Sequence, residues 1–216
     1  MQRVACARLL QGSLALIAAV AAALVLGIAS AGAANLTTNG SFETGDFTGW
    51  ATTDPGSPCT PWTVLLSPSS NWCYVGFDSS WPTAISAVDG NYFADVTWDG
   101  DGTGDALLSQ TVSLPTIKPA KLTWSDNTSW DLTFGATQPR VEYVQILNSD
   151  GSAVLQSYPI QTLMPNTIGA TGWVKHTRSL ARFAGMTVQI QFRLTIPENF
   201  TGPANFALDN VALVTR

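Results

Sequence analysis

The sequence contains little histidine, little cysteine and few basic residues. His176 is the only histidine, and only Cys59 and Cys73 follow the N-terminal apolar leader. Two cysteines with one distant histidine do not supply the four ligands that a structural zinc site needs. The 10 lysines and arginines are outnumbered by 15 aspartates and glutamates, giving a formal net charge of −5. This balance argues against nucleic acid and against an anionic membrane surface as partners, because both require a basic surface.

The chain also lacks recognisable catalytic motifs. There is no G-x-S-x-G nucleophile elbow, and His176 lies in a segment, residues 173–178, that is typical of an exposed strand. We interpret it as an ordinary surface histidine. Glycosidase chemistry needs two carboxylates facing each other across a cleft, and no pattern in the sequence singles out such a pair. The candidates are Asp95 with Asp126 and Asp131 with Glu142. We therefore predict that the protein is not an enzyme.

The first 34 residues have the organisation of a secretory signal. Arg3 and Arg8 precede an apolar stretch over residues 14–28, and Ala31-Gly32-Ala33 is a small-residue cleavage site. The alternative is a retained membrane anchor, since residues 14–34 are nearly long enough to span a bilayer. We predict cleavage, a secreted protein and no membrane insertion afterwards. Removing the leader leaves 8 basic against 15 acidic residues, a formal charge of −7.

The two remaining cysteines lie in a segment with unusual composition. Residues 52–88 contain five prolines, which oppose central strands, and three tryptophans. This pattern predicts a long loop. An exported cysteine pair with no competing thiol is expected to oxidise, so we predict a Cys59–Cys73 disulfide that pins the loop; two free thiols are the alternative. Such a bridge contributes about 3 kcal/mol if it is unstrained.

The rest of the chain shows the period-two alternation of β-strands and no long helical periodicity. Strands are predicted near residues 91–98, 108–114, 141–147 and 188–195, separated by Gly, Pro, Asp and Asn turns. The sequence Asn148-Ser149-Asp150-Gly151-Ser152 is a turn signal, so a return strand is expected near residues 153–158. Residues 180–185 indicate one short helical turn. Several such strands favour a single all-β domain over residues 35–216, an antiparallel sandwich or barrel.

Five ordered motifs resemble secreted β-sandwich jelly rolls of the carbohydrate-binding-module 4/9 and 22 type, which have a galactose-binding-like fold. They are NGSFE followed by GW at residues 39–50, GNYFADV at 90–96, LLSQTVSL at 107–114, the segment at 172–194 and FALDNVALV at 206–214. The first and last motifs are similar to the first and last strands of that fold. The resemblance implies a fold and a broad role, and it names no ligand because one sandwich hosts many functions.

The resemblance also implies a structural calcium ion where the first and last strands meet. The matching residues are Glu43 and Asp209, with Asn39 and the backbone near it as further oxygen ligands. Calcium takes six to eight oxygen ligands, and carboxylates with carbonyls suit it. Both carboxylates have apolar neighbours in the sequence, and a buried carboxylate needs a counter-charge or several donors. The alternative is that they are solvated or bound by backbone N–H groups.

The function that this resemblance implies is non-catalytic binding of a glycan or polysaccharide. Sugar rings stack on aromatic side chains, and amides, carboxylates and guanidinium groups bond their hydroxyls. The candidate ligand-binding residues are Trp72, Tyr74, Trp81, Trp130, Gln189, Gln191 and Arg193. Each aromatic residue has the alternative of anchoring a loop, and the polar strand face has the alternative of being simply solvated. The main functional alternative is an extracellular structural or protein-interaction module without sugar affinity, and the weakest is a polysaccharide-active enzyme.

Overall fold

A computed structural model describes residues 34–54, 60–69, 84–99 and 103–215. The leader, both cysteines and the aromatic candidates Trp72, Tyr74 and Trp81 lie outside these residues. Signal cleavage, the disulfide and any role of those three rings therefore stay predictions from the sequence.

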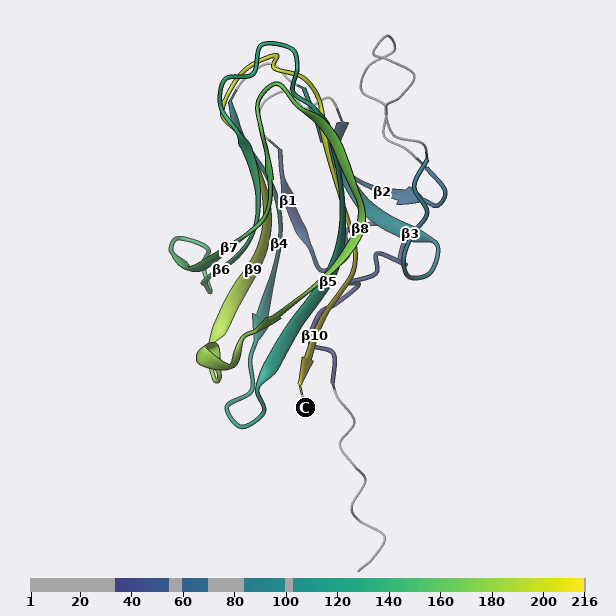
Figure 1. Ribbon diagram of the computed structural model, residues 1–216. Coiled ribbons are helices and arrows are strands. Elements are labelled where there is room, and N and C mark those ends of the chain that lie inside the picture. Colours follow the sequence, from purple (N-terminus) through teal and green to yellow (C-terminus); the bar gives the residue numbers. More distant parts are fainter. Residues whose placement is uncertain (1–33, 55–59, 70–83, 100–102, 216) are drawn as a thin grey trace, which may run out of the picture. The chain divides into compact units, whose positions relative to one another are not determined.

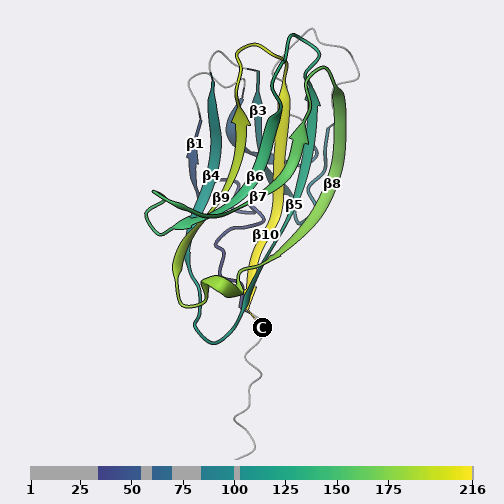
Figure 2. The same ribbon diagram turned by 60° about the vertical axis from the view of Figure 1, so that its left-hand side comes forward.

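Within these residues, ten antiparallel strands form two five-stranded sheets that pack face to face (Figures 1 and 2). Sheet I has the order β1 (Ala51–Thr53), β4 (Gly104–Ser113), β9 (Thr187–Ile196), β6 (Arg140–Asn148) and β7 (Val154–Leu163). Sheet II has the order β2 (Thr60–Leu66), β3 (Tyr92–Trp98), β10 (Ala204–Thr215), β5 (Ala120–Asp131) and β8 (Ile168–Ser179). A 3₁₀ turn, η1 (Ala181–Phe183), lies between β8 and β9. The predicted all-β sandwich, the β6–β7 hairpin and the short helical turn are confirmed.

The core lies between the sheets because apolar residues alternate along the strands. On β9, Val188, Ile190, Phe192 and Leu194 are fully buried, while the residues between them are only partly buried or exposed. The same parity places the even-numbered residues of β5 and β6 in the interior, among them Leu122, Trp124, Val144 and Ile146. Residues of opposite parity form the outer faces of the two sheets.

The predicted first strand at residues 39–50 is wrong, because this segment is a series of turns. Asn39 and Phe42 have φ values of 48° and 58°, a left-handed conformation outside the extended region of regular strands. The segment is nevertheless tightly packed against β10. A Cβ at Gly40 would lie 1.8 Å from the carbonyl oxygen of Val211, and the Val211 N–H donates to the Gly40 carbonyl at 2.8 Å. The glycine of the motif therefore serves close backbone approach to the last strand.

The prediction that residues 52–88 form a loop throughout is also wrong, because β2 occupies residues 60–66. β2 pairs with β3 at the edge of sheet II, with a register shift between Thr60 and Thr63. An edge strand tolerates Pro61, which cannot donate to a neighbour. Trp62 on this strand is 6% exposed and packs edge-on against Phe206 at a centroid distance of 6.0 Å. It is a core residue and not a loop aromatic.

The strands β7 and β8 lie at the same lateral edge of the sandwich, one from each sheet, and consecutive in the chain (Figure 1). Side chains from both strands therefore meet where the interior opens to solvent. The described residues include no helix long and apolar enough to cross a membrane.

Candidate functional site

Polar side chains occupy the outer face of sheet I in cross-strand rows. Tyr143 on β6 lies opposite Arg193 on β9, which lies opposite Leu107 on β4. One step along, Gln145 lies opposite Gln191, which lies opposite Ser109, and the next row contains Leu147, Gln189 and Thr111. Directly opposed residues on antiparallel strands have Cβ atoms about 5 Å apart, so these side chains form one continuous surface. We call this surface the outer face.

The predicted residues Gln189, Gln191 and Arg193 all lie on this outer face. Within the described part of the chain, the amides of Gln189 and Gln191 have no hydrogen-bond partner, so both are available to a ligand. Arg193 instead forms a bidentate pair with Asp105, with Nε–Oδ1 at 2.8 Å and Nη2–Oδ2 at 2.9 Å. The face is therefore electrically neutral and rich in amide and hydroxyl groups.

The outer face is bordered at one end by the β6–β7 turn, and two of its polar residues are buried. The β6–β7 turn projects outward from sheet I (Figure 1), and a Cβ at Gly151 in this turn would lie 2.8 Å from the Gln189 amide oxygen. Ser109 and Gln145 are buried although they point away from the core. The Gln145 amide donates to the Ser157 hydroxyl at 3.1 Å, which fixes its orientation. Sequence alternation indicated the β9 residues but gave no sign of Tyr143 and Gln145, because their proximity depends on β6 pairing with β9.

Trp130, the remaining aromatic candidate, does not join the outer face. It lies on β5 in sheet II, where its indole N–H donates to the Thr167 hydroxyl at 2.9 Å. A Cβ at Gly169 would lie 2.3 Å from its ring, so the ring covers that glycine closely. Its apolar contacts are with a small cluster that contains Leu132, Leu163 and Ala204. These contacts are those of a ring that anchors the strand ends.

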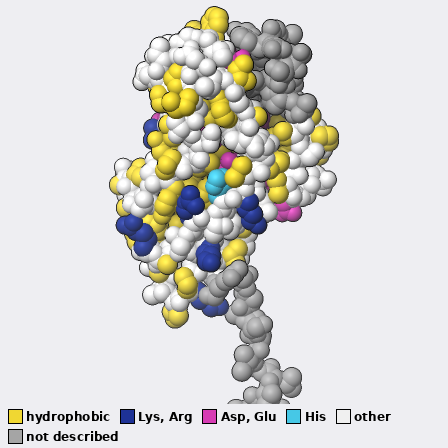
Figure 3. All heavy atoms as spheres, in the orientation of Figure 1, with side chains coloured by type: hydrophobic (Ala, Val, Ile, Leu, Met, Phe, Trp, Pro, Cys, Tyr) yellow, Lys and Arg dark blue, Asp and Glu magenta, His cyan; other side chains and the backbone are white. Residues whose placement is uncertain are grey.

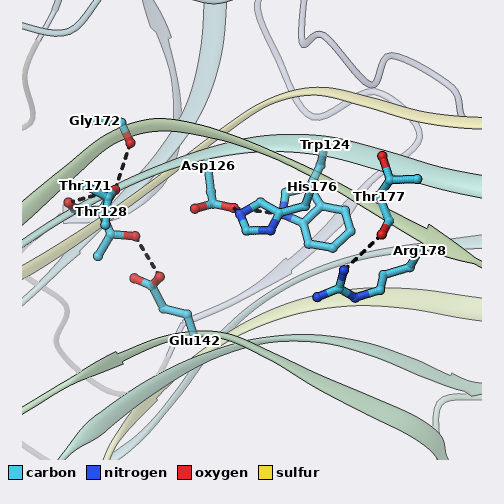
Figure 4. Close-up of polar contacts among 9 residues, drawn as sticks. All are labelled: Trp124, Asp126, Thr128, Glu142, Thr171, Gly172, His176, Thr177 and Arg178. Carbon is cyan, nitrogen blue, oxygen red and sulfur yellow. Dashed lines mark hydrogen bonds and ion pairs between the residues drawn. The ribbon is translucent and has the colours of Figure 1, made fainter.

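A second polar cluster lies inside the sandwich (Figure 4). Asp126 and Thr128 on β5 and Glu142 on β6 all point into the interior, where their exposed fractions are 2%, 0% and 0%. The Thr128 hydroxyl donates to Glu142 Oε2 at 2.7 Å and so connects the two sheets. The other carboxyl oxygen, Oε1, is buried and has no partner among the described residues. Both strands that meet here are irregular, with register shifts at Asn127/Ser129 and at Glu142/Tyr143.

His176 belongs to this cluster and is not an ordinary surface histidine. Its Nε2 lies 2.8 Å from Asp126 Oδ1, and its ring stacks on Trp124 with centroids 4.9 Å apart. The Trp124 indole N–H donates to the same carboxylate oxygen at 2.9 Å. No local sequence pattern predicts this arrangement, because His176 reaches Trp124 only through the pairing of β5 with β8.

Burial shifts the pKa values of these groups toward their uncharged forms. Desolvation raises the pKa of Asp126 to about 7, although the hydrogen bond from Trp124 lowers it in part. The pKa of Glu142 is raised well above its ordinary value by burial, and the nearby Asp126 carboxylate adds to the shift. The pKa of His176 is lowered by burial and by the charge of Arg178. The cluster therefore favours protonated carboxyl groups next to a neutral imidazole.

Neither of the carboxylate pairs considered from the sequence is brought together. Asp95 lies on the outer side of sheet II, bonded by the Asn205 amide at 2.7 Å, whereas Asp126 lies on the inner side. Asp131 accepts the hydroxyl of Thr133 at the strand end, away from the inward-pointing Glu142. Strand parity separates both pairs and places Asp126 near Glu142 instead.

The carboxylates of Glu43 and Asp209, the predicted calcium ligands, both bind backbone N–H groups of the segment at residues 88–92. Glu43 accepts the backbone N–H groups of Asn91 and Tyr92 at 2.8–3.0 Å. Asp209 accepts those of Val88, Asp89 and Asn210 at 2.6–2.9 Å. Burial raises the pKa of Asp209 to about 6 despite these bonds. The side chain of Asn39 is engaged elsewhere, since it donates to the Asp46 carbonyl and accepts from the Thr44 N–H.

These contacts fit a calcium ion only in part. Glu43 Oε2 and Asp209 Oδ1 each accept a single N–H bond, so each retains an unused lone pair. Among the described residues, however, no three His, Cys, Asp or Glu side chains are grouped so that they could hold a metal ion. An ion at this position would depend on carbonyl and water oxygens for most of its ligands.

The sequence matches no protein-family model and no curated protein. Solved structures do match the fold. TmCBM61 in complex with β-1,4-galactotriose has a TM-score of 0.51 at 18% identity, covering 85% of this chain and 99% of that one. A CBM4 structure has a TM-score of 0.42 at 11% identity, covering 78% and 96%. The CBM22-1 xylan-binding domain of Paenibacillus barcinonensis Xyn10C has a TM-score of 0.40 at 12% identity, covering 81% of this chain and 90% of that one.

Of these three, the match to TmCBM61 exceeds a TM-score of 0.5, and at 18% identity it establishes the fold and nothing finer. It agrees with the two antiparallel sheets described above and with the resemblance carried by the sequence motifs. The described part of this chain has the β-sandwich fold of the carbohydrate-binding modules.

Proposed function

We propose that this protein is a secreted, non-catalytic carbohydrate-binding protein that binds a neutral glycan chain on the outer face of sheet I. The observation that carries the proposal is the neutral outer face itself. It offers the unpartnered amides of Gln189 and Gln191 beside the Tyr143 ring, and its one cation, Arg193, is paired with Asp105. Amide and hydroxyl groups bond sugar hydroxyls without attracting charged ligands. That TmCBM61 was solved with a galactotriose supports galactan as the first glycan to test.

The interior acids do not support a hydrolytic function. A glycosidase places its two carboxyl groups on either side of a substrate bond, within reach of solvent. Asp126 and Glu142 are 2% and 0% exposed, so a sugar ring cannot enter between them without opening the sandwich. The proposal therefore assigns no turnover to this site.

The test is the affinity of residues 35–216 for neutral polysaccharides, measured by affinity electrophoresis and calorimetry with β-1,4-galactan, xylan and β-glucan. Tyr143→Ala and Gln191→Ala should each weaken binding, Tyr143→Ala by about 10-fold or more if its ring is a central contact. Ile117→Ala is the control, because Ile117 is 92% exposed in the turn between β4 and β5 and off the outer face. Unchanged binding in both outer-face variants would contradict the assignment of the site to the outer face. Absence of binding to every neutral glycan would contradict the proposed function.

One observation favours the alternative of a protein-interaction module. Four large apolar side chains are more than half exposed at the same end of the sandwich, three in the β5–β6, β7–β8 and β9–β10 connections and one at the first residue of β8. They are Phe134, Met164, Ile168 and Phe200. An exposed apolar patch is typical of association surfaces. Self-association measured by light scattering, together with no glycan affinity, would favour this alternative.

A further inference from the structure

The basic residues of this acidic chain are strongly segregated. After the leader, the chain contains eight lysines and arginines and 15 acidic residues. No acidic residue occurs in residues 106–125 or in residues 151–197. These two stretches contain six of the eight cations. One of them, Arg193, is paired with Asp105 on the outer face, and the other five are Lys118, Lys121, Lys175, Arg178 and Arg182. A surface built from these stretches is positive although the whole molecule is negative.

The fold brings the two stretches together at one edge of the sandwich. In the β5–β8 ladder, Lys121 lies opposite Ser179 and Lys175 lies opposite Ser125. The turn after β8 packs on the turn before β5, since the Leu180 N–H donates to the Ala120 carbonyl at 2.9 Å. The five cations therefore flank the free edge formed by β8 and the turns next to it. Lys121 and Lys175 project from the outer side of sheet II, and Arg178 projects from the side that faces β7. We call this surface the basic edge. Figure 3 shows Lys and Arg side chains gathered on the face that carries the histidine, with little acidic surface among them.

None of the five cations is neutralised by an ion pair within the described residues. Among the described residues, the charged pair is Arg193 with Asp105, and the Asp126 carboxyl group contacts His176. The Asp126 carboxylate lies behind the imidazole and is 2% exposed, so it is not available to the basic edge. Uncompensated cations in a chain of net charge −7 attract an anionic partner locally.

Two guanidinium groups of the basic edge are held in place by uncharged contacts. Arg178 lies over the Tyr158 ring at 5.5 Å and over the Trp124 ring at 6.0 Å, and its Nη1 donates to the Thr177 carbonyl (Figure 4). Arg182 donates to the Gln156 amide oxygen at 2.7 Å and lies over Phe183 at 5.1 Å. Ordered guanidinium groups that keep their charge and further N–H donors bind carboxylate and sulfate groups with little loss of side-chain freedom.

We infer that the basic edge is a second binding site, separate from the outer face, for a polysaccharide that carries carboxylate or sulfate groups. Five cations spread over the β8 edge, the start of β5 and the adjoining turns suit a linear chain with spaced negative charges that crosses this edge. Nucleic acid is the less favoured partner, because its dense phosphates would be repelled by the remaining acidic surface. The inference does not depend on neutral-glycan binding, since it involves different residues and a different ligand charge.

The test measures binding of residues 35–216, which contain all ten strands and the core, to polygalacturonate and to dextran sulfate. Each is measured at 50 and 500 mM NaCl, beside neutral galactan. We expect binding to both acidic chains at low salt and its loss at high salt, because exposed charges are screened. Lys175→Gln and Arg182→Gln should each weaken it by about 2- to 5-fold, and the double variant by more.

The matched control is Thr53→Glu, which changes the net charge by the same amount as Lys175→Gln but lies on the exposed strand β1 of sheet I. An equal loss of affinity in Thr53→Glu would show that only net charge matters and would overturn the site. So would no binding to either acidic polysaccharide at 50 mM NaCl. Tighter binding to a 20-nucleotide single-stranded DNA or to anionic vesicles would overturn the assignment to a glycan. Unchanged galactan binding in the basic-edge variants would show that the two sites are independent.

Discussion

Glu142 shows how one residue links the interior chemistry to stability. Its side chain is completely buried, one carboxyl oxygen accepts the Thr128 hydroxyl and the other has no partner within the described residues. Burial raises its pKa well above the ordinary 4.5, and Asp126 nearby has a pKa raised from 3.8 to about 7. A carboxyl whose pKa is higher in the folded state binds more protons folded than unfolded. Its contribution to folding therefore weakens as pH rises above the unfolded pKa.

We predict that the melting temperature falls as pH rises from about 5 to 8. The free energy of unfolding should decrease over this range by on the order of a few kcal/mol in total. Glu142→Gln keeps an oxygen that accepts the Thr128 hydroxyl but cannot ionise. It should therefore flatten this decline and melt higher than the unsubstituted protein at pH 8. The measurement is thermal unfolding by circular dichroism across this pH range.

Asp150→Asn is the control for this prediction. Hydrogen bonds from Ser152 lower the pKa of the Asp150 carboxyl, so its titration lies below the tested range. It should leave the pH slope unchanged. A Glu142→Gln protein with the same slope as the unsubstituted protein would show that Glu142 does not titrate in the interior.

At the scale of elements, the strand β2 shows that a proline-rich segment still contributes to the core. Its pairing with β3 is limited to an edge, and its register shifts once. The main contribution of β2 to the core is Trp62, which is buried and packs against Phe206 of β10. Leu66 on the same strand is 60% exposed and contributes little to the core.

Trp62→Ala should therefore destabilise the protein by about 3–5 kcal/mol, because it leaves a cavity under β2. Leu66→Ala, on the same strand, should change stability by less than about 1 kcal/mol. Denaturant unfolding of both variants measures the difference. Equal, small effects would indicate that β2 is not packed on the sandwich.

On the scale of the whole molecule, the two termini of the domain are joined through the segment 88–92. Glu43 from the N-terminal turns and Asp209 from the last strand both bind backbone N–H groups of this segment. A calcium ion here would bind only the folded state and would raise its stability by mass action. The unused lone pairs on Glu43 Oε2 and Asp209 Oδ1 are the positions at which we propose that it binds.

We predict that millimolar calcium raises the melting temperature relative to chelator and that Asp209→Asn removes the increase. Differential scanning calorimetry with and without calcium measures both. Magnesium serves as the control ion, because its demand for a tight octahedral site differs from that of calcium. A melting temperature that is the same in calcium and chelator would make the calcium prediction wrong and leave both carboxylates with backbone N–H partners alone.

The sequence alone determined the fold class and most strands, because period-two alternation and turn residues are local and survive without knowledge of partners. It also indicated the polar face of β9, since Gln189, Gln191 and Arg193 alternate with buried residues. The turns at residues 39–50 and the strand at 60–66 were missed because positive φ values and edge pairing depend on what each segment packs against.

Only the tertiary structure decided which side chains meet. Tyr143 joins Arg193, His176 joins Asp126, and Lys121 joins the cations of β8 through pairings between strands separated by tens of residues. Such contacts follow from strand order and register. A shift of one residue in register would turn each of these side chains to the opposite face of its sheet.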